Sequence, residues 1–255
     1  MIKISIFWLF LVLSCGVYAG FTTSLSRIIY NEADTSKSLI LASTNQYPVV
    51  TQTWIDHGDG IANQVISPFV VLPAVFKIQP ERLQTLKIIH NGDSMPQDRE
   101  SVFWLNLLEI PSYTSEQIQP LGPDQARLTL SMNTQLKIFY RPKKLEKMSL
   151  NTIIEKLKFS VQQLDGKFVL ICENMSPYNV SFSQLGIISK DKKIIIEQQM
   201  DMMTQALTQR AYELPNGTKI IEPESINFSV IDDSGRVHDG TYDYRMKKID
   251  FKIQD

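Results

Sequence analysis

The 255 residues suffice for one large domain or two modest ones, since a domain usually has about 100 to 150 residues. An apolar content of 43% with 21% charged residues is typical of a globular chain and excludes a disordered or collagen-like one. The formal net charge of −1 gives no strong positive field, so no nucleic-acid partner is expected.

Residues 1–19 have the pattern of a secretory signal peptide. Lys3 provides the positive start, an apolar run follows, and Val17-Tyr18-Ala19 forms a small-x-small cleavage site. A membrane anchor is disfavoured because the apolar run is shorter than the roughly 20 residues of a spanning helix, so no membrane insertion of the mature chain is expected. Lipid attachment at Cys15 is an alternative, because the residues before it loosely match a lipobox.

Cleavage after Ala19 would leave Cys172 as the single cysteine, which cannot form a disulfide within the chain. Its apolar neighbours in FVLICENM predict a small buried side chain rather than a nucleophile. The fold is therefore expected to depend on its apolar core.

Between Gly20 and Pro142 the sequence consists of short β-type runs separated by turn residues. Turn signals such as Gly58-Asp59-Gly60 and Asn91-Gly92 interrupt the runs. Seven such runs predict an antiparallel β-sandwich of the immunoglobulin type. The runs are SLSRIIY, SKSLILAS, PVVTQTWI, PFVVL, ERLQTLKIIH, SVFWLNLLEI and RLTLSMNTQLKIFY.

The last of these runs, with its flanks at 127–142, is longer than the modal strand of about five to six residues. Its apolar residues alternate with polar ones, which places Leu128, Leu130 and Met132 on one face and Lys137 on the other. The surplus apolar half either packs within its own domain or binds another protein. The preceding segment, 112–125, is predicted to be a long loop because it contains two prolines and a glycine.

After Pro142 a polar linker is predicted until about Leu157, followed by a second sandwich. The predicted domains are therefore 20–142 and 143–255. The runs of the second domain are KLKFSVQ, KFVLICEN, YNVSFSQLGII, KKIIIEQQ, AYELP, INFSVID and TYDYRM. Within this domain, the residues Met200, Met202 and Met203 are expected to fill the core rather than to form a soft binding surface.

The sequence contains none of the common hydrolase, zinc or nucleotide-binding motifs. Its three histidines, His57, His90 and His238, are far apart in sequence, and the segment 56–60 is interpreted as a turn rather than a calcium loop. We therefore predict no enzyme, no cofactor and no metal, although a constellation of distant residues would escape a motif search.

Several stretches resemble, in order along the chain, the periplasmic pilus chaperones, the PapD-like proteins of the chaperone-usher pathway. The resemblance spans most of residues 21–185 and implies an all-β fold of two immunoglobulin-like β-sandwich domains at an angle, with a cleft between them. The stretches are SRIIYNEADTSKSL, YPVVTQTWID, PFVVLPAVFKIQP, RESVFWLNLLEIP, TQLKIFYRP and FVLICENMSPYNVSFSQL.

The resemblance also implies a binding site. Arg27 and Lys137 match the pair that holds the C-terminal carboxylate of a pilus subunit, whereas by themselves they could be strand cations that extend to solvent. Leu128, Leu130 and Met132 match the hydrophobic row that enters the groove of an incomplete subunit, which is donor-strand complementation. The alternative is that these three residues pack in their own core.

Glu100, Arg141 and Asp233 match the buried charge triad that links the two domains in this family; the alternative is three solvated surface charges. The long 112–125 loop lacks the cysteine pair of some long-loop members, so the chaperone subclass is not assigned.

Together, the resemblance predicts an exported periplasmic chaperone that stabilises pilus or fimbrial subunits and delivers them to an outer-membrane usher without ATP. Self-association of the free form through its exposed strand is left open. The alternative is an exported structural or adhesive β-sandwich surface subunit, which gives no reason for TQLKIFYRP or for the paired cations.

Overall fold

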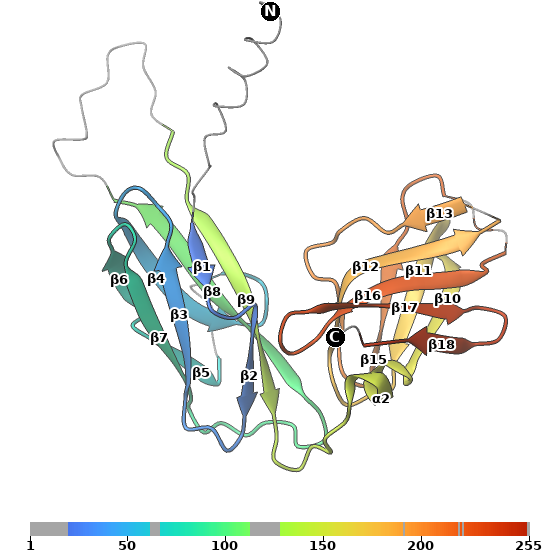
Figure 1. Cartoon of the computed structure of the whole chain (residues 1–255), viewed down its shortest axis with the longest axis horizontal. Coiled ribbons are helices and arrows are strands. Elements are labelled where there is room, and N and C mark those ends of the chain that lie inside the picture. Colours follow the sequence, from blue (N-terminus) through green and yellow to red (C-terminus); the bar gives the residue numbers. More distant parts are fainter. Residues whose placement is uncertain are drawn as a thin grey trace, which may run out of the picture.

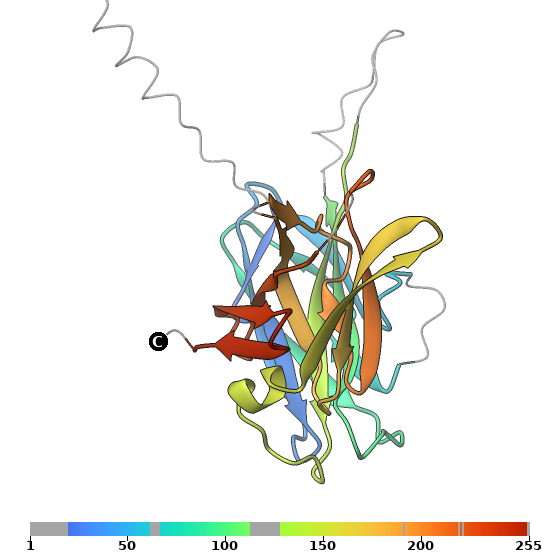
Figure 2. The same cartoon turned by 90° about the vertical axis from the view of Figure 1, so that its right-hand side faces the viewer.

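The computed structural model describes residues 20–61, 67–112, 128–190, 192–218, 220 and 222–253. It contains two β-sandwiches side by side, joined at one end by the segment between β9 (Met132–Arg141) and the short helix α2 (Leu150–Ile154) (Figure 1). The strands of the first sandwich run steeply in this view, whereas β12, β16, β17 and β18 of the second run nearly across it (Figure 1). Figure 2 shows the second sandwich from its free side. The predicted fold class is confirmed.

The first domain consists of two sheets, with strand orders β1-β3-β7-β5 and β2-β9-β8-β4-β6. Strand β2 pairs with β9 in parallel, and the other pairs are antiparallel. The remaining strands are β1 (Phe21–Thr23), β2 (Arg27–Asn31), β3 (Lys37–Ser43), β4 (Val49–Asp56), β5 (Phe69–Leu72), β6 (Val75–Ile78), β7 (Leu83–His90) and β8 (Ser101–Pro111).

Alternating apolar residues of both sheets form the core of the first domain. In β9 the side chains of Leu136, Ile138 and Tyr140 are buried there, opposite Leu39 and Leu86 of the other sheet. Full burial of a Leu or Ile side chain stabilises a fold by about 1.5 to 3 kcal/mol, so this alternation fixes which face of β9 is turned inward.

The second domain has one sheet of order β10-β11-β15 and one of order β13-β12-β16-β17-β18, with β14 paired to β12. Its strands are β10 (Leu157–Leu164), β11 (Lys167–Asn174), β12 (Val180–Ser189), β13 (Lys192–Ile195), β14 (Met203–Thr204), β15 (Thr208–Glu213), β16 (Ser225–Ile231), β17 (Val237–Asp243) and β18 (Lys248–Phe251). Helix α2 precedes β10. The side chain of Ser149 caps this helix by accepting a hydrogen bond from Thr152 N at 3.2 Å.

The structure differs from the predicted runs at several points. The first run forms a strand only at β2, and β1 lies before that run; the short elements β1, β6, β14, β18 and α2 were not predicted. The last run of the first domain is paired only from Met132 onward, rather than from residue 127. The predicted start of regular strand near Leu157 is correct.

Buried positions also test the predictions for sulfur-containing residues. Cys172 is fully buried, as predicted, and burial raises the pKa of its thiol to about 12. Met202 and Met203 are buried as expected, but the expectation is wrong for Met200, which is 96% exposed in the loop before β14. The proposed signal peptide with Cys15, and most of the 112–125 loop, lie outside the described residues. Within those residues no helix is long and apolar enough to cross a membrane.

Candidate functional site

Arg27 and Lys137 occupy facing positions of the parallel pair β2–β9, so the two predicted cations lie side by side. Lys137 lies between the buried residues Leu136 and Ile138 of β9, so its side chain points to the opposite face of the sheet. Both cations therefore lie on the sheet face that is turned toward the second domain, where each contacts a residue of that domain.

Arg27 is only 9% exposed and is held across the domain boundary. Its Nη1 donates a hydrogen bond to the carbonyl oxygen of Ile231 at 3.0 Å, and its guanidinium lies 5.6 Å from the ring centroid of Phe139. Its Nε has no hydrogen-bond partner among the described residues. Burial lowers the pKa of Arg27, opposed by the nearby charges of Asp233 and Asp232. The site thus presents a largely dehydrated cation with an unused donor.

Lys137 does not extend freely into solvent. Its Nζ lies 2.6 Å from Oδ1 of Asp201, in the loop before β14, and its side chain is 21% exposed. The other carboxylate oxygen of Asp201 lies 3.3 Å from Nη1 of Arg210 in β15. Sequence reasoning missed Asp201 and Arg210, because neither belongs to a motif and both are more than sixty residues from Lys137.

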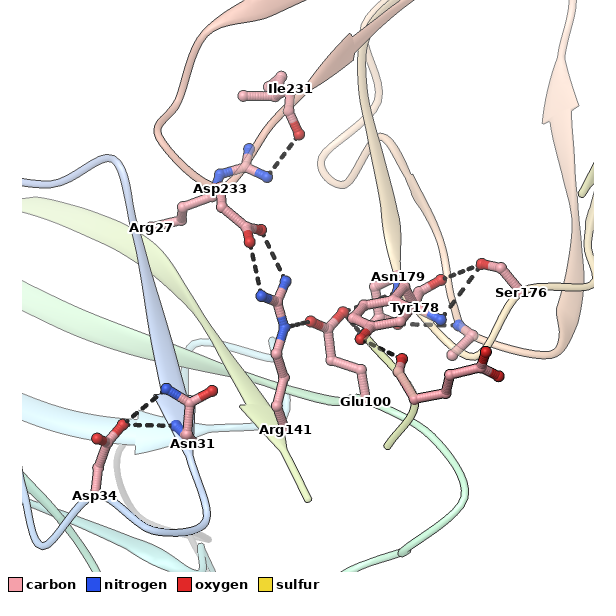
Figure 3. A network of polar contacts seen from close by, with 12 residues as sticks. Arg27, Asn31, Asp34, Glu100, Arg141, Ser176, Tyr178, Asn179, Ile231 and Asp233 are labelled. Atoms are coloured by element: carbon pink, nitrogen blue, oxygen red, sulfur yellow. Dashed lines mark hydrogen bonds and ion pairs between the residues drawn. The ribbon is translucent and has the colours of Figure 1, made fainter. Parts of the chain in front are cut away.

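Glu100, Arg141 and Asp233 form a continuous network between the domains (Figure 3). Arg141 Nε donates to Glu100 Oε1 at 2.7 Å, and its two terminal nitrogens donate to both Asp233 oxygens at 2.7 and 2.8 Å. Glu100 immediately precedes β8, Arg141 ends β9, and Asp233 lies in the turn between β16 and β17, which reaches toward β2 and β9 in Figure 1. The arrangement is a bidentate pair extended by a second carboxylate. Glu100 is buried, but the Asp233 side chain is 58% exposed, so this member of the triad is not buried as predicted.

The Glu100 side chain is almost entirely buried, yet its charge is compensated on both sides. Beside the bond from Arg141, its Oε2 accepts hydrogen bonds from the backbone N and the side-chain amide of Asn179 at 2.8 and 2.9 Å. Burial raises the pKa of Glu100, opposed by Arg141 and Asn179. Burial also lowers the pKa of Arg141, but Asp233 and Glu100 together raise it above its ordinary value. Removal of Arg141 would leave the buried carboxylate of Glu100 without its cation.

Apolar side chains supplement these polar contacts. Trp104 and Phe139 of the first domain pack with Met203 of the second, and all three are buried. A cavity of about 510 Å³ lies beside the network, lined on its first-domain side by Arg27, Phe139 and Arg141, and on its second-domain side by residues that include Val180, Ser181, Val230 and Asp233. No group of three or more side chains suited to hold a metal ion occurs in the part of the chain that the structure describes.

The free end of β9 carries the three predicted hydrophobic residues. Pairing between β8 and β9 ends at Met132, opposite Glu109, so Leu128 and Leu130 precede the paired strand. Leu128 is 81% exposed, Leu130 is 72% exposed and Met132 is 44% exposed. They are therefore not sealed in the core of their own domain; their role in binding a subunit stays a prediction.

A buried amide network holds β9 close to this free end. Asn106, fully buried in β8, accepts hydrogen bonds at its Oδ1 from Asn133 Nδ2 at 3.0 Å and from Gln135 Nε2 at 2.8 Å. Its own amide nitrogen donates to Asp56 Oδ2 at 2.9 Å. Asp56 also accepts from the backbone nitrogens of Gly58 and Gly60, which agrees with the predicted turn. Sequence reasoning missed Asn106, which stands as the one amide within an apolar strand.

Comparison with known families gives matches along most of the chain. Residues 20–146 match the family described as "Pili and flagellar-assembly chaperone, PapD N-terminal domain", and residues 152–242 match "Pili assembly chaperone PapD, C-terminal domain". Among relatives of this chain, the probable fimbrial chaperone YadV of Escherichia coli strain K12 is 33% identical over 73% of this chain and 76% of its own. Chaperone protein LpfB of Salmonella typhimurium is 30% identical over 86% of this chain and 87% of its own.

Solved structures agree with the fold. The crystal structure of the YadV chaperone has a TM-score of 0.70 at 29% identity and covers 88% of this chain and 98% of its own. The Salmonella enterica SafB chaperone, solved in complex with the SafA pilin, has a TM-score of 0.69 at 21% identity, with 90% and 98% covered. The chain therefore belongs to the PapD-like family of pilus-assembly chaperones, whose role is not enzymatic.

Proposed function

We propose that this chaperone binds newly exported pilus or fimbrial subunits in the periplasm, keeps them soluble by donor-strand complementation, and delivers them to an outer-membrane usher. The observation that carries the proposal is the free end of β9, where an apolar row leaves the sheet unpaired and exposed. Relatives named as fimbrial chaperones support it, as does the SafB chaperone solved in complex with a pilin. These names also disfavour the alternative of a structural or adhesive surface subunit.

Complementation follows from the chemistry of an incomplete sandwich. A subunit that lacks a strand has unpaired backbone groups along a sheet edge and an open groove into its core, and such edges aggregate. Leu128, Leu130 and Met132 would fill the groove while the backbone of the same segment pairs with the subunit edge. Because they share a face with the buried residues Leu136 and Ile138, the subunit would continue the sandwich of the chaperone.

The subunit's C-terminal carboxylate would be held by Arg27 and Lys137. Arg27 offers an unused Nε donor in a buried setting, and the neighbouring Lys137 offers a second cation. Charge-assisted hydrogen bonds to a partly desolvated carboxylate are among the stronger polar contacts in proteins. This grip would fix the register, since a slip of one residue would turn every apolar side chain of the donor segment outward.

The triad of Glu100, Arg141 and Asp233 would keep the two domains at the angle that the grip requires. The contact of Arg27 with Ile231 belongs to the same boundary, so the cation and the triad are positioned together. In this proposal export depends on residues 1–19 as a signal peptide, and the exposed donor segment also provides a surface through which free copies associate with one another.

The proposal is tested by co-expression with a pilin-type subunit in the periplasm, with recovery of soluble subunit as the measurement. Arg27→Ala and Lys137→Ala should each leave a folded chaperone and abolish that recovery. Lys87→Ala and Arg82→Ala, which remove exposed cations of the same domain, are the matched controls and should recover the wild-type amount. Wild-type recovery with both cleft variants would refute the carboxylate grip. Finding the chain itself within purified fibres would favour the structural-subunit alternative.

A further inference from the structure

In the free chaperone, Lys137, the lysine proposed to bind the subunit's C-terminal carboxylate, already contacts a carboxylate of the chaperone itself. Asp201, which comes from the second domain, lies 2.6 Å from Lys137 Nζ. A C-terminal carboxylate that binds Lys137 must therefore replace a carboxylate that is present before binding. The proposed function, on which this inference rests, does not by itself require such a competitor.

Asp201 has a second cation that would retain it after such an exchange. Arg210 Nη1 lies 3.3 Å from Asp201 Oδ2. Arg210 is itself fixed, because its Nη1 donates to the carbonyl oxygen of Met203 at 2.9 Å, its Nη2 donates to Gln199 Oε1 at 3.3 Å, and its guanidinium lies 4.9 Å from the ring centroid of Tyr212. Departure of Lys137 would therefore leave Asp201 paired rather than as an isolated charge.

The side chains of the ion pair are partly exposed, although Asp201 Oδ1 itself is buried and, apart from its ion pair with Lys137, has no hydrogen-bond partner among the described residues. The side chains of Lys137, Asp201 and Arg210 are 21%, 29% and 28% exposed. Partly exposed pairs of this kind contribute little net stability, because solvent screens them and two side chains must be ordered to form them. Exchange of one carboxylate for another at Lys137 is therefore close to balanced.

We propose that Asp201 is a specificity-determining residue that competes with the client's C-terminal carboxylate for Lys137. A free peptide with an α-carboxylate gains little when it displaces Asp201. A true subunit adds the burial of Leu128, Leu130 and Met132, which the competitor cannot match. Asp201 thus raises the threshold for binding and excludes partners that offer a carboxylate alone, which is discrimination against the wrong ligand rather than added attraction to the right one.

The test is the Kd of a synthetic peptide with the subunit's C-terminal sequence, prepared with a free α-carboxylate and with an α-amide. Asp201→Asn should bind the free acid about fivefold more tightly than the wild type does, as expected when a partly exposed pair no longer competes, and should bind the amide unchanged. Asp250→Asn, an exposed carboxylate of the same domain, is the control and should match the wild type for both peptides. Asp201→Ser gives a second variant should the asparagine disturb folding.

Equal or weaker binding of the free acid by both Asp201 variants, or no measurable binding by either, would overturn the inference. The proposed function is judged separately, by the dependence of intact-subunit recovery on Lys137. If Lys137→Ala abolishes that recovery while the Asp201 variants do not distinguish acid from amide, only the role of Asp201 fails. If Lys137→Ala has no effect on recovery, the carboxylate grip itself fails.

Discussion

Replacement of Leu128 and Leu130 by serine isolates the contribution of the donor segment to subunit binding. In the free chaperone 81% and 72% of these residues' surfaces are exposed, so most of their burial is still available to a partner. Full burial of a leucine contributes about 1.5 to 3 kcal/mol, and the exposed fractions scale this to about 2.3 to 4.6 kcal/mol for the pair. The double variant should therefore bind a subunit about 40-fold to 2,000-fold more weakly.

The assay is a titration of labelled subunit with purified chaperone at fixed salt, with urea unfolding of the free chaperone measured in parallel. Because the two leucines are exposed, the stability of the free chaperone should change by less than about 0.5 kcal/mol. Leu83→Ser is the matched control, since Leu83 is 69% exposed on β7 of the same domain and lies outside the donor segment. Subunit affinity within about threefold of wild type, or a marked loss of chaperone stability, would refute the reasoning.

Glu100→Gln should lower the free energy of unfolding in urea by about 3 kcal/mol, because the NH₂ group of the new amide would face a donor of Arg141 or Asn179. A free energy of unfolding equal to that of the wild type would contradict a buried, compensated charge at Glu100. In the chain without residues 1–19, Cys172 should resist iodoacetamide at pH 7 until denatured, since a pKa of about 12 leaves a thiolate fraction of about 10⁻⁵, and labelling of the native chain would contradict its burial. Burial raises the pKa of Asp232, but hydrogen bonds that include those from His238 and Ser234 lower this pKa overall. The ionised Asp232 should therefore stabilise the fold fully at pH values above its pKa in the unfolded chain, near 3.9, and this stabilisation should be lost as the pH falls below that value. In Asp232→Asn, the free energy of unfolding should fall less steeply with decreasing pH than in the wild type. An unchanged dependence of stability on pH would contradict this role of Asp232. Gly235→Ala should weaken the contact between the domains, because Gly235 has φ +86° and an added Cβ would meet Ser26 of the first domain. The measurement is the small-angle scattering profile, which should differ from that of the wild type; an unaltered profile would contradict the prediction.

The alternation of apolar residues was sufficient to predict most of the fold. It identified the inward face of β9 at Leu136 and Ile138 and placed Lys137 on the opposite face, since side chains alternate strictly along a strand. It could not indicate that pairing stops at Met132, because β8 itself continues past the facing Glu109 to Pro111 and pairs there with β4, so the ladder ends where β9 leaves the sheet. Helix α2 was missed because five residues are too few to show a helical period.

The candidate site was predictable only in part. Arg27 and Lys137 were identified by resemblance, and the parallel pairing of β2 with β9 explains why two residues 110 positions apart become neighbours. Asp201 and Arg210 carry no such signal, since their meeting with Lys137 depends on how the second domain is placed against the first. Asn106 interrupts an apolar run, and its partner Asp56 is known only once strands β4 and β8 are paired.

The central claim, that the free end of β9 completes a subunit's sheet, is tested most directly by amide hydrogen exchange at Leu128 to Ser131, resolved by residue, in the free chaperone and in its complex with a subunit. In the free protein these amides precede the paired strand and should exchange rapidly. On binding, protection should extend from Met132 back through Leu128. Exchange that is equally rapid at these residues in the complex would contradict donor-strand complementation by this chain.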